Sequence, residues 1–174
     1  MQLRISCVSA REDLDTLSLH KDHHLSTYGS IRLHWLIAED EADIRNLVAM
    51  MCQVWGHQPM PFESGQKAWD WLDKVEKDDY DDTLPAFAIM DIRMPGYRGD
   101  QVAQRIRKMD KLKDIPIMLM TAFVLTDEER EEMMESAGVD IIINKPLPDF
   151  TDLKTIIDNV IDKRQHAETG NSSS

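Results

Sequence analysis

The sequence predicts a single α/β domain, in which a doubly wound, five-stranded parallel sheet carries helices on both faces. Two observations predict this fold class. Short apolar runs alternate five times with stretches of helical periodicity, which is typical of consecutive strand–helix units. Polar residues directly follow several of these runs, at the positions where the strands of such a sheet would end.

Composition narrows the class of protein. The 174 residues suffice for one domain with a sizeable core, and 42% of them are hydrophobic and 30% charged, as in globular proteins. No apolar run approaches the roughly 18–20 residues that cross a bilayer, and two cysteines imply no disulfide framework. A net charge of −12 repels phosphate backbones. We therefore expect a cytoplasmic protein that binds neither membrane nor nucleic acid.

The chain divides into three segments. Residues 1–30 are of mixed polar and apolar character and are interpreted as an N-terminal extension, partly ordered or flexible, without the continuous apolar core of a signal peptide. Residues 31–164 hold every predicted strand and helix. Residues 165–174 are small and polar, which predicts a disordered tail.

The first strand is predicted at residues 33–38, an apolar run that ends at the acidic Glu39-Asp40-Glu41. A helix follows and is stopped by Gly56, because glycine commonly ends helices. The apolar residues expected on the buried face of this helix are Ile44, Leu47, Val48, Met51 and Val54.

The second strand, residues 57–62, contains Pro59 and Pro61, which are tolerated only in an edge strand or a loop. Ser64 is a suitable N-cap for a second helix. The apolar residues of that helix are Ala68, Trp69, Leu72 and Val75.

The rest of the domain repeats the strand–helix pattern three times. The predicted strands are residues 86–90, 115–120 and 139–143. The predicted helices are residues 100–109, a helix that begins at a capping box of Thr126 with Glu129 and ends at Gly138, and residues 149–161.

The order of the strands follows from the prolines of the second strand. They fit a sheet edge, which is where the flavodoxin-like order 2-1-3-4-5 places that strand. In such sheets ligands bind at the carboxyl ends of the strands, near the point where the strand order reverses. The residues at those strand ends are therefore the candidate site.

Five polar residues are expected to meet at this rim: Glu39, Asp40, Asp91, Thr121 and Lys145. Three neighbouring carboxylates raise one another's pKa values unless a cation compensates their charge. Hard oxygen ligands suit Mg²⁺, and an ammonium group beside them could contact a phosphoryl oxygen. The pattern indicates an electrostatic clamp for a phosphoryl group.

These residues and their neighbours resemble the receiver domain of two-component response regulators, in its stand-alone, chemotaxis-regulator-like form. The resemblance covers about residues 32–163. The stretches that carry it are Leu36-Ile37-Ala38-Glu39-Asp40-Glu41, Met90-Asp91-Ile92-Arg93-Met94-Pro95-Gly96, Met120-Thr121-Ala122 and Asn144-Lys145-Pro146-Leu147.

The resemblance implies a phosphoacceptor and a metal site. Asp91 would accept a phosphoryl group from the phosphohistidine of a histidine kinase or a phosphotransfer protein. Asp40 would ligate Mg²⁺ directly, or Mn²⁺ in its place, and Glu39 would do so through a water. The main-chain carbonyl of Arg93 would be a further ligand, as would Asp91 itself.

The resemblance also implies the residues that act on the phosphoryl group. Thr121 would hydrogen-bond it and move inward with it, and Lys145 would pair with its oxygens. The peptide bond before Pro146 would be cis. Such proteins are not conventional enzymes, but they catalyse their own phosphorylation and dephosphorylation.

Three positions are expected to affect the conformational change on phosphorylation and the lifetime of the phosphoryl group. Ile142 stands where the family usually has Tyr or Phe, so we expect a weaker conformational change or a partner surface that reads aliphatic packing. Arg93 and Phe123 lie two residues after Asp91 and Thr121. The resemblance implies that they tune hydrolysis of the acyl phosphate, and a bulky Phe123 predicts a long-lived phosphoryl state.

The output is expected to be protein docking. About a dozen polar residues follow the last helix, fewer than a DNA-binding module needs. A downstream protein, whose identity the sequence leaves open, would bind the surface formed by the fourth helix, the fifth strand and the fifth helix. A homodimer through the same surface is a second expectation.

Three other classes of protein are alternatives. A phosphatase of the haloacid-dehalogenase type needs a second acid where Arg93 stands, and an arginine cannot be a general acid at neutral pH. A flavin-binding electron carrier needs a phosphate loop where Glu39-Asp40-Glu41 would repel the phosphate. A receiver fold that acts as a phosphorylation-independent adaptor remains the alternative, and Ile142 is compatible with it.

Overall fold

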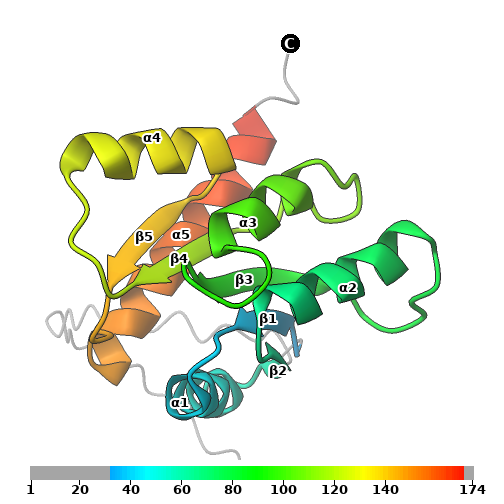
Figure 1. Ribbon diagram of the computed structural model, residues 1–174, viewed down its shortest axis with the longest axis horizontal. Helices are drawn as coiled ribbons and strands as arrows, with labels where there is room; N and C mark the ends of the chain where they lie inside the picture. The colour runs from blue at the N-terminus through cyan, green and yellow to red at the C-terminus, as the bar shows by residue number, and fades with distance from the viewer. Residues whose placement is uncertain (1–31, 171–174) are drawn as a thin grey trace, which may run out of the picture.

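The computed structural model describes residues 32–170, so the predicted extension at residues 1–30 lies outside the described residues (Figure 1). Strands and helices alternate strictly along this part of the chain. They are β1 (His34–Ala38), α1 (Ala42–Val54), β2 (Gln58–Phe62), α2 (Gly65–Glu76), β3 (Pro85–Asp91), α3 (Gly99–Arg107), β4 (Ile117–Thr121), α4 (Asp127–Ala137), β5 (Ile141–Asn144) and α5 (Phe150–Gly170).

The strands form one parallel sheet in the order β2-β1-β3-β4-β5, which confirms the predicted topology. The prolines of β2 explain its edge position. The Gln58 N–H donates to the carbonyl of Leu33 at 2.9 Å, and backbone groups alternate in direction along a strand. Pro59 and Pro61 therefore direct their ring nitrogens away from β1, where no ladder bond is lost.

Helices cover both faces of the sheet and enclose two apolar cores. α2, α3 and α4 pack on one face, together with strand residues such as Leu36 and Ala88. α1 and α5 pack on the other face, together with Trp35 and Ile89. Side chains alternate between the two cores along each strand, as expected for strands buried on both faces. No described helix combines the length and the apolar character that crossing a membrane requires.

α1 differs from its predicted buried face. Val48 and Cys52 are fully buried, whereas Leu47 is 44% exposed and Val54 is 67% exposed. The prediction was wrong for Leu47 and Val54 because the apolar stripe of the helix is wider than the area that the sheet and α5 cover. An apolar strip is therefore left facing outward on α1.

α5 is longer than its sequence pattern predicted. It was expected to end near Ile161, with disorder from Gln165, but it continues to Gly170. No glycine or proline interrupts it before that residue. Arg164 ties this part of the helix to the domain, because its guanidinium lies 3.1 Å from Asp140 Oδ1 and donates to the carbonyl of Asp114. Residues 171–174 lie outside the described part of the chain.

Candidate functional site

The carboxyl ends of four strands bring the predicted residues to one rim of the sheet. Asp91 and Thr121 are the last residues of β3 and β4, and their strands are paired in register there. Glu39 directly follows β1, and Lys145 directly follows β5. The parallel register places these strand ends at one level, so the sequence prediction of a shared rim agrees with the structure.

Lys145 lies among the carboxylates. Its Nζ atom is 2.7 Å from Glu39 Oε2 and 3.3 Å from Asp91 Oδ1. A third contact, 3.6 Å to Glu41 Oε1, adds an acid that the sequence analysis did not assign to the site. Glu39 is fully buried and Asp91 is 6% exposed, whereas Asp40 is exposed. Asp91 is thus nearly buried and is grouped with one buried acid, Glu39, and one exposed acid, Asp40.

Burial and the contacts among these charged groups shift their pKa values. Burial raises the pKa of Glu39 and of Asp91 above their ordinary values, and the charge of Lys145 only partly opposes this. Burial alone would lower the pKa of Lys145, but its contacts with Glu39 and Asp91 outweigh that effect and raise the pKa. The ammonium group therefore stays charged, and the carboxylates lack a full complement of positive charge.

The residues fit a hard divalent cation. Carboxylate oxygens of Glu39, Asp40 and Asp91 all lie within 4.8 Å of one another. When these three acids are ionised, the single charge of Lys145 leaves the group with a net charge of about −2. Mg²⁺ prefers oxygen ligands and usually takes only one or two carboxylates alongside waters. The donor set and its charge deficit therefore match Mg²⁺ or Mn²⁺.

Arg45 positions the first two acids, and sequence reasoning missed it. Its Nη1 donates to the main-chain carbonyls of Glu39 at 2.7 Å and Asp40 at 3.1 Å. The guanidinium of an α1 residue thus holds the loop that carries both carboxylates. Nothing in the sequence separates this arginine from an ordinary surface residue, because its partners are carbonyl groups.

Two glycines allow the loop after Asp91 to return closely to the sheet. Gly96, with φ of +83°, adopts the left-handed conformation that its pairing with Pro95 predicts for a turn. A Cβ atom on Gly99 would lie 2.3 Å from the Asp91 carbonyl oxygen, so the start of α3 packs directly on the end of β3. Gly99 was not identified from the sequence.

Arg93 and Phe123 lie together at the mouth of the site. Arg93 Cζ is 3.5 Å from the centroid of the Phe123 ring, and both side chains are exposed. The Phe123 N–H donates to Thr121 Oγ1 at 3.1 Å. Arg93 follows Asp91 by two positions, and Phe123 follows Thr121 by two positions. The hydrogen bond therefore ties the Phe123 segment to the side chain of Thr121.

The far side of the site is built by β5. The Lys145 N–H donates to the Thr121 carbonyl at 2.7 Å, and the Lys145–Pro146 peptide bond is cis, as the resemblance implied. Ile142 is 4% exposed and packs in the core against α4. Arg130 of α4 donates to the Ile142 carbonyl and to Asn144 Oδ1, which links α4 to the end of β5.

Comparison with known proteins agrees with this geometry. The response regulator receiver domain family matches residues 35–158. The chain is 26% identical to response regulator Rre1 of Synechocystis sp. over 80% of its own length and 56% of that protein. It is 30% identical to chemotaxis protein CheY-3 of Vibrio cholerae over 74% of its length and 91% of that protein. The chain thus spans little more than half of Rre1, but nearly all of CheY-3.

A solved structure extends the comparison to the fold. The response regulator TrrA of Thermotoga maritima, determined in complex with Mg²⁺ and BeF, is 28% identical. It superimposes with a TM-score of 0.57 over 74% of this chain and 98% of TrrA.

Proposed function

Because the chain belongs to the response regulator receiver domain family, we propose that it accepts a phosphoryl group on Asp91 in a Mg²⁺-dependent reaction. One observation carries the proposal. The buried carboxylate of Asp91 lies beside Lys145 and within a group of three acids whose charge is not balanced. A nucleophile, a cationic group and a cation site are the elements that phosphoryl transfer requires.

The residues that would hold the metal are Glu39, Asp40 and Asp91, with the main-chain carbonyl of Arg93. A bound Mg²⁺ ion would neutralise charge on the oxygens of the phosphoryl group. The complex of TrrA with Mg²⁺ and BeF supports a Mg²⁺ site in this chain by homology. Arg45 would keep the Glu39–Asp40 loop in position.

The proposed chemistry is a transfer from nitrogen to oxygen. A carboxylate oxygen of Asp91 attacks the phosphorus of a phosphohistidine, so an O–P bond forms and the N–P bond breaks. The electron pair returns to the imidazole nitrogen, which takes up a proton from water. Lys145 would pair with a phosphoryl oxygen. The hydroxyl of Thr121 accepts the Phe123 N–H and keeps its own hydrogen to donate.

The phosphoryl donor would be a histidine kinase or a phosphotransfer protein. It must bring its phosphohistidine to the rim, and α1 begins at that rim, directly after Glu41. Leu47, Met50 and Val54 form an exposed apolar strip along this helix, with Met50 59% exposed. A helical donor surface that covers this strip would bury apolar side chains on the helix that begins at the rim.

The output side is also a proposal. A downstream protein, and a homodimer, are proposed to use the surface of α4, β5 and α5. A cytoplasmic location belongs to the same proposal. The alternative is a phosphorylation-independent adaptor, favoured by one observation: Ile142 is a buried aliphatic residue where the family usually carries an aromatic one.

Intact-mass spectrometry after incubation with acetyl phosphate tests the phosphoacceptor. We expect a gain of one phosphoryl group in Mg²⁺, none in excess chelator, and none in Asp91→Asn. Asp79→Asn, which removes an exposed acid far from the rim, should behave as the wild type. A folded wild-type protein that gains no phosphoryl group in Mg²⁺ would favour the adaptor instead.

A further inference from the structure

α4 carries a concentration of negative charge that the described part of the chain does not balance. Six of its eleven residues are acidic and one, Arg130, is basic. Among residues 32–170, none of the six carboxylates forms an ion pair with a lysine or arginine. The six are Asp127, Glu128, Glu129, Glu131, Glu132 and Glu135.

The placement of these acids is unfavourable for an isolated helix. Carboxylates in the first turn suit a helix N-terminus, and Glu129 completes the capping box with Thr126. Glu132 and Glu135 lie further along, where that benefit is lost. Glu128 and Glu132 are four residues apart and repel each other, and no basic residue stands in the last turn. Arg130 is already occupied by β5.

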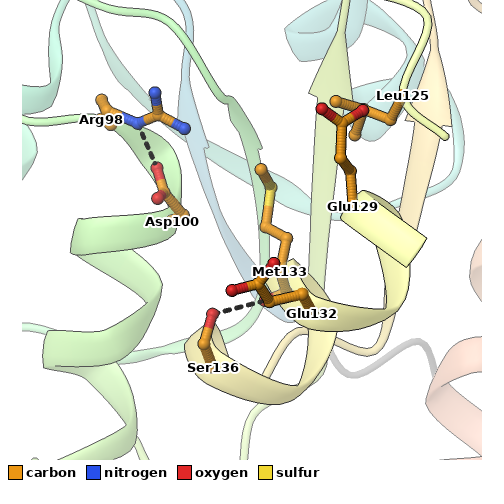
Figure 2. A pocket seen from close by; sticks show the side chains of 7 residues that line it. All are labelled: Arg98, Asp100, Leu125, Glu129, Glu132, Met133 and Ser136. Atoms are coloured by element: carbon orange, nitrogen blue, oxygen red, sulfur yellow. Dashed lines mark hydrogen bonds and ion pairs between the residues drawn. The ribbon is translucent and has the colours of Figure 1, made fainter. Parts of the chain in front are cut away.

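A groove of about 320 Å³ runs between this acidic helix and the start of α3 (Figure 2). On the α3 side its wall holds Arg98 and Asp100, which pair with each other at 2.8 Å. On the α4 side its lining includes Leu125, Glu129, Glu132, Met133 and Ser136. Figure 2 shows Met133 extending into the space between the two helices. The groove thus combines apolar side chains with carboxylates, and the arginine that lines it is already paired.

We propose that this groove docks a basic amphipathic segment of a partner protein. Lysine or arginine side chains of the segment would meet Glu132 and Glu129, and an apolar side chain would cover Leu125 and Met133. Charge complementarity selects this occupant, because an acidic peptide or a nucleic acid would be repelled. A second copy packed two-fold on the groove would place Glu132 opposite acids of the same helix, which is also repulsive.

The proposal does not depend on the phosphorylation of Asp91, so it can be tested on the unmodified chain. The probe is a synthetic twelve-residue peptide with lysine and leucine at helical spacing. Two peptides serve as controls: one with serine in place of leucine at the same charge, and one with glutamate in place of lysine. Binding is followed by NMR of the ¹⁵N-labelled full chain and by calorimetry.

Two matched variants decide whether the groove is the site. Glu132→Lys and Glu131→Lys make the same charge change on the same helix, but Glu132 lines the groove and Glu131 does not. Both remove a like-charge contact, so both should fold at least as well as the wild type, which circular dichroism checks. We expect the lysine–leucine peptide to shift amides of α3 and α4, and Glu132→Lys to weaken its affinity about tenfold. Glu131→Lys should weaken it no more than about threefold.

Three results would overturn the proposal. Equal losses in the two variants would indicate general charge attraction to an acidic protein. Equal binding of the lysine–serine peptide would show that Leu125 and Met133 contribute nothing. Amide shifts confined to other parts of the domain would place the docking surface elsewhere.

Discussion

The positive charge of Lys145 offsets part of the negative charge at the rim. Its ammonium group contacts Glu39, Asp91 and Glu41, and its own side chain is 9% exposed. Burial raises the pKa values of Glu39 and Asp91, and a metal or phosphoryl ligand would change which partners the lysine contacts.

The charge of Asp91 should destabilise the metal-free protein. Burial raises its pKa, so the stability that its protonated form provides is present at acidic pH and is lost as pH rises through the raised pKa. The amide of an asparagine side chain mimics the neutral carboxyl group. We therefore expect Asp91→Asn to increase the free energy of unfolding by about 1 kcal/mol at neutral pH and by much less near pH 4. Urea unfolding in chelator measures this, and Asp79→Asn should show no such pH-dependent gain.

Arg45 should set the affinity for the metal. Without its bonds to the Glu39 and Asp40 carbonyls, the loop loses a fixed position. Removing such a supporting group typically weakens metal binding by about 10-fold or more, so we expect that loss in Arg45→Ala. Mg²⁺ titration by calorimetry measures it. Lys74→Ala, an exposed cation on α2, is the control, and an equal loss there would indicate a general charge effect instead.

Phe123 should prolong the phosphoryl state. Arg93 stacks on its ring and the pair lies at the mouth of the site, where it can hinder an attacking water. We expect the acyl phosphate of Phe123→Ala to hydrolyse several-fold faster than that of the wild type, followed by the decay of the phosphorylated mass. Val124→Ala truncates a neighbouring side chain that is 90% exposed, and its half-life should match the wild type. A wild-type half-life no longer than that of Phe123→Ala would remove the role of Phe123.

Among the helices on its face of the sheet, α4 is the most weakly attached. Ala137 is its sole fully buried residue, whereas α2 and α3 each bury several. Repulsion among its acids adds to this. Arg130 compensates by joining α4 to β5 through the Ile142 carbonyl and Asn144. With Ile142 buried in place of an aromatic switch residue, this arginine is the direct polar link between the two elements.

Arg130→Ala should therefore loosen α4 before it affects the rest of the domain. A hydrogen bond from a charged group is worth about 1.5–3 kcal/mol, and we expect a loss of stability near the lower end because Asn144 is exposed. Hydrogen exchange should show lower protection in α4, with α2 unchanged. Arg130→Lys keeps the charge but not the forked geometry, so its protection in α4 should lie between that of the wild type and that of Arg130→Ala. Equal loss of protection in α2 would contradict a local role for Arg130.

A bound metal ion should stabilise the folded chain as a whole. The proposed ligands come from β3 and from the loops that follow β1 and β3, so a cation held there favours the folded chain over the unfolded one. At a Mg²⁺ concentration of 100 times the dissociation constant, the expected gain in the free energy of unfolding is about 2.7 kcal/mol. Thermal unfolding measures it. Asp40→Asn should show a smaller gain at the same concentration, and an equal gain would place the ion elsewhere.

Patterns in the amino-acid sequence were enough to predict the order of the elements, the edge position of β2 and the residues that line the rim. These features depend on patterns within short segments: apolar runs, the prolines at positions 59 and 61, and the polar residues that end each strand. In a parallel sheet all strand ends of one kind meet at one edge, so Asp91, Thr121 and Lys145 could be brought together without coordinates.

Features that depend on neighbours distant in the chain became visible only in the folded structure. Arg45 and Arg130 bond to carbonyl groups, and every residue offers a carbonyl, so no side-chain pattern marks the partner. Gly99 matters because its Cα lies against the Asp91 carbonyl. The exposed strip at Leu47 and Val54 depends on how much of α1 the sheet covers. Contacts of this kind are set by the separation and orientation of packed elements, which helical or strand periodicity does not encode.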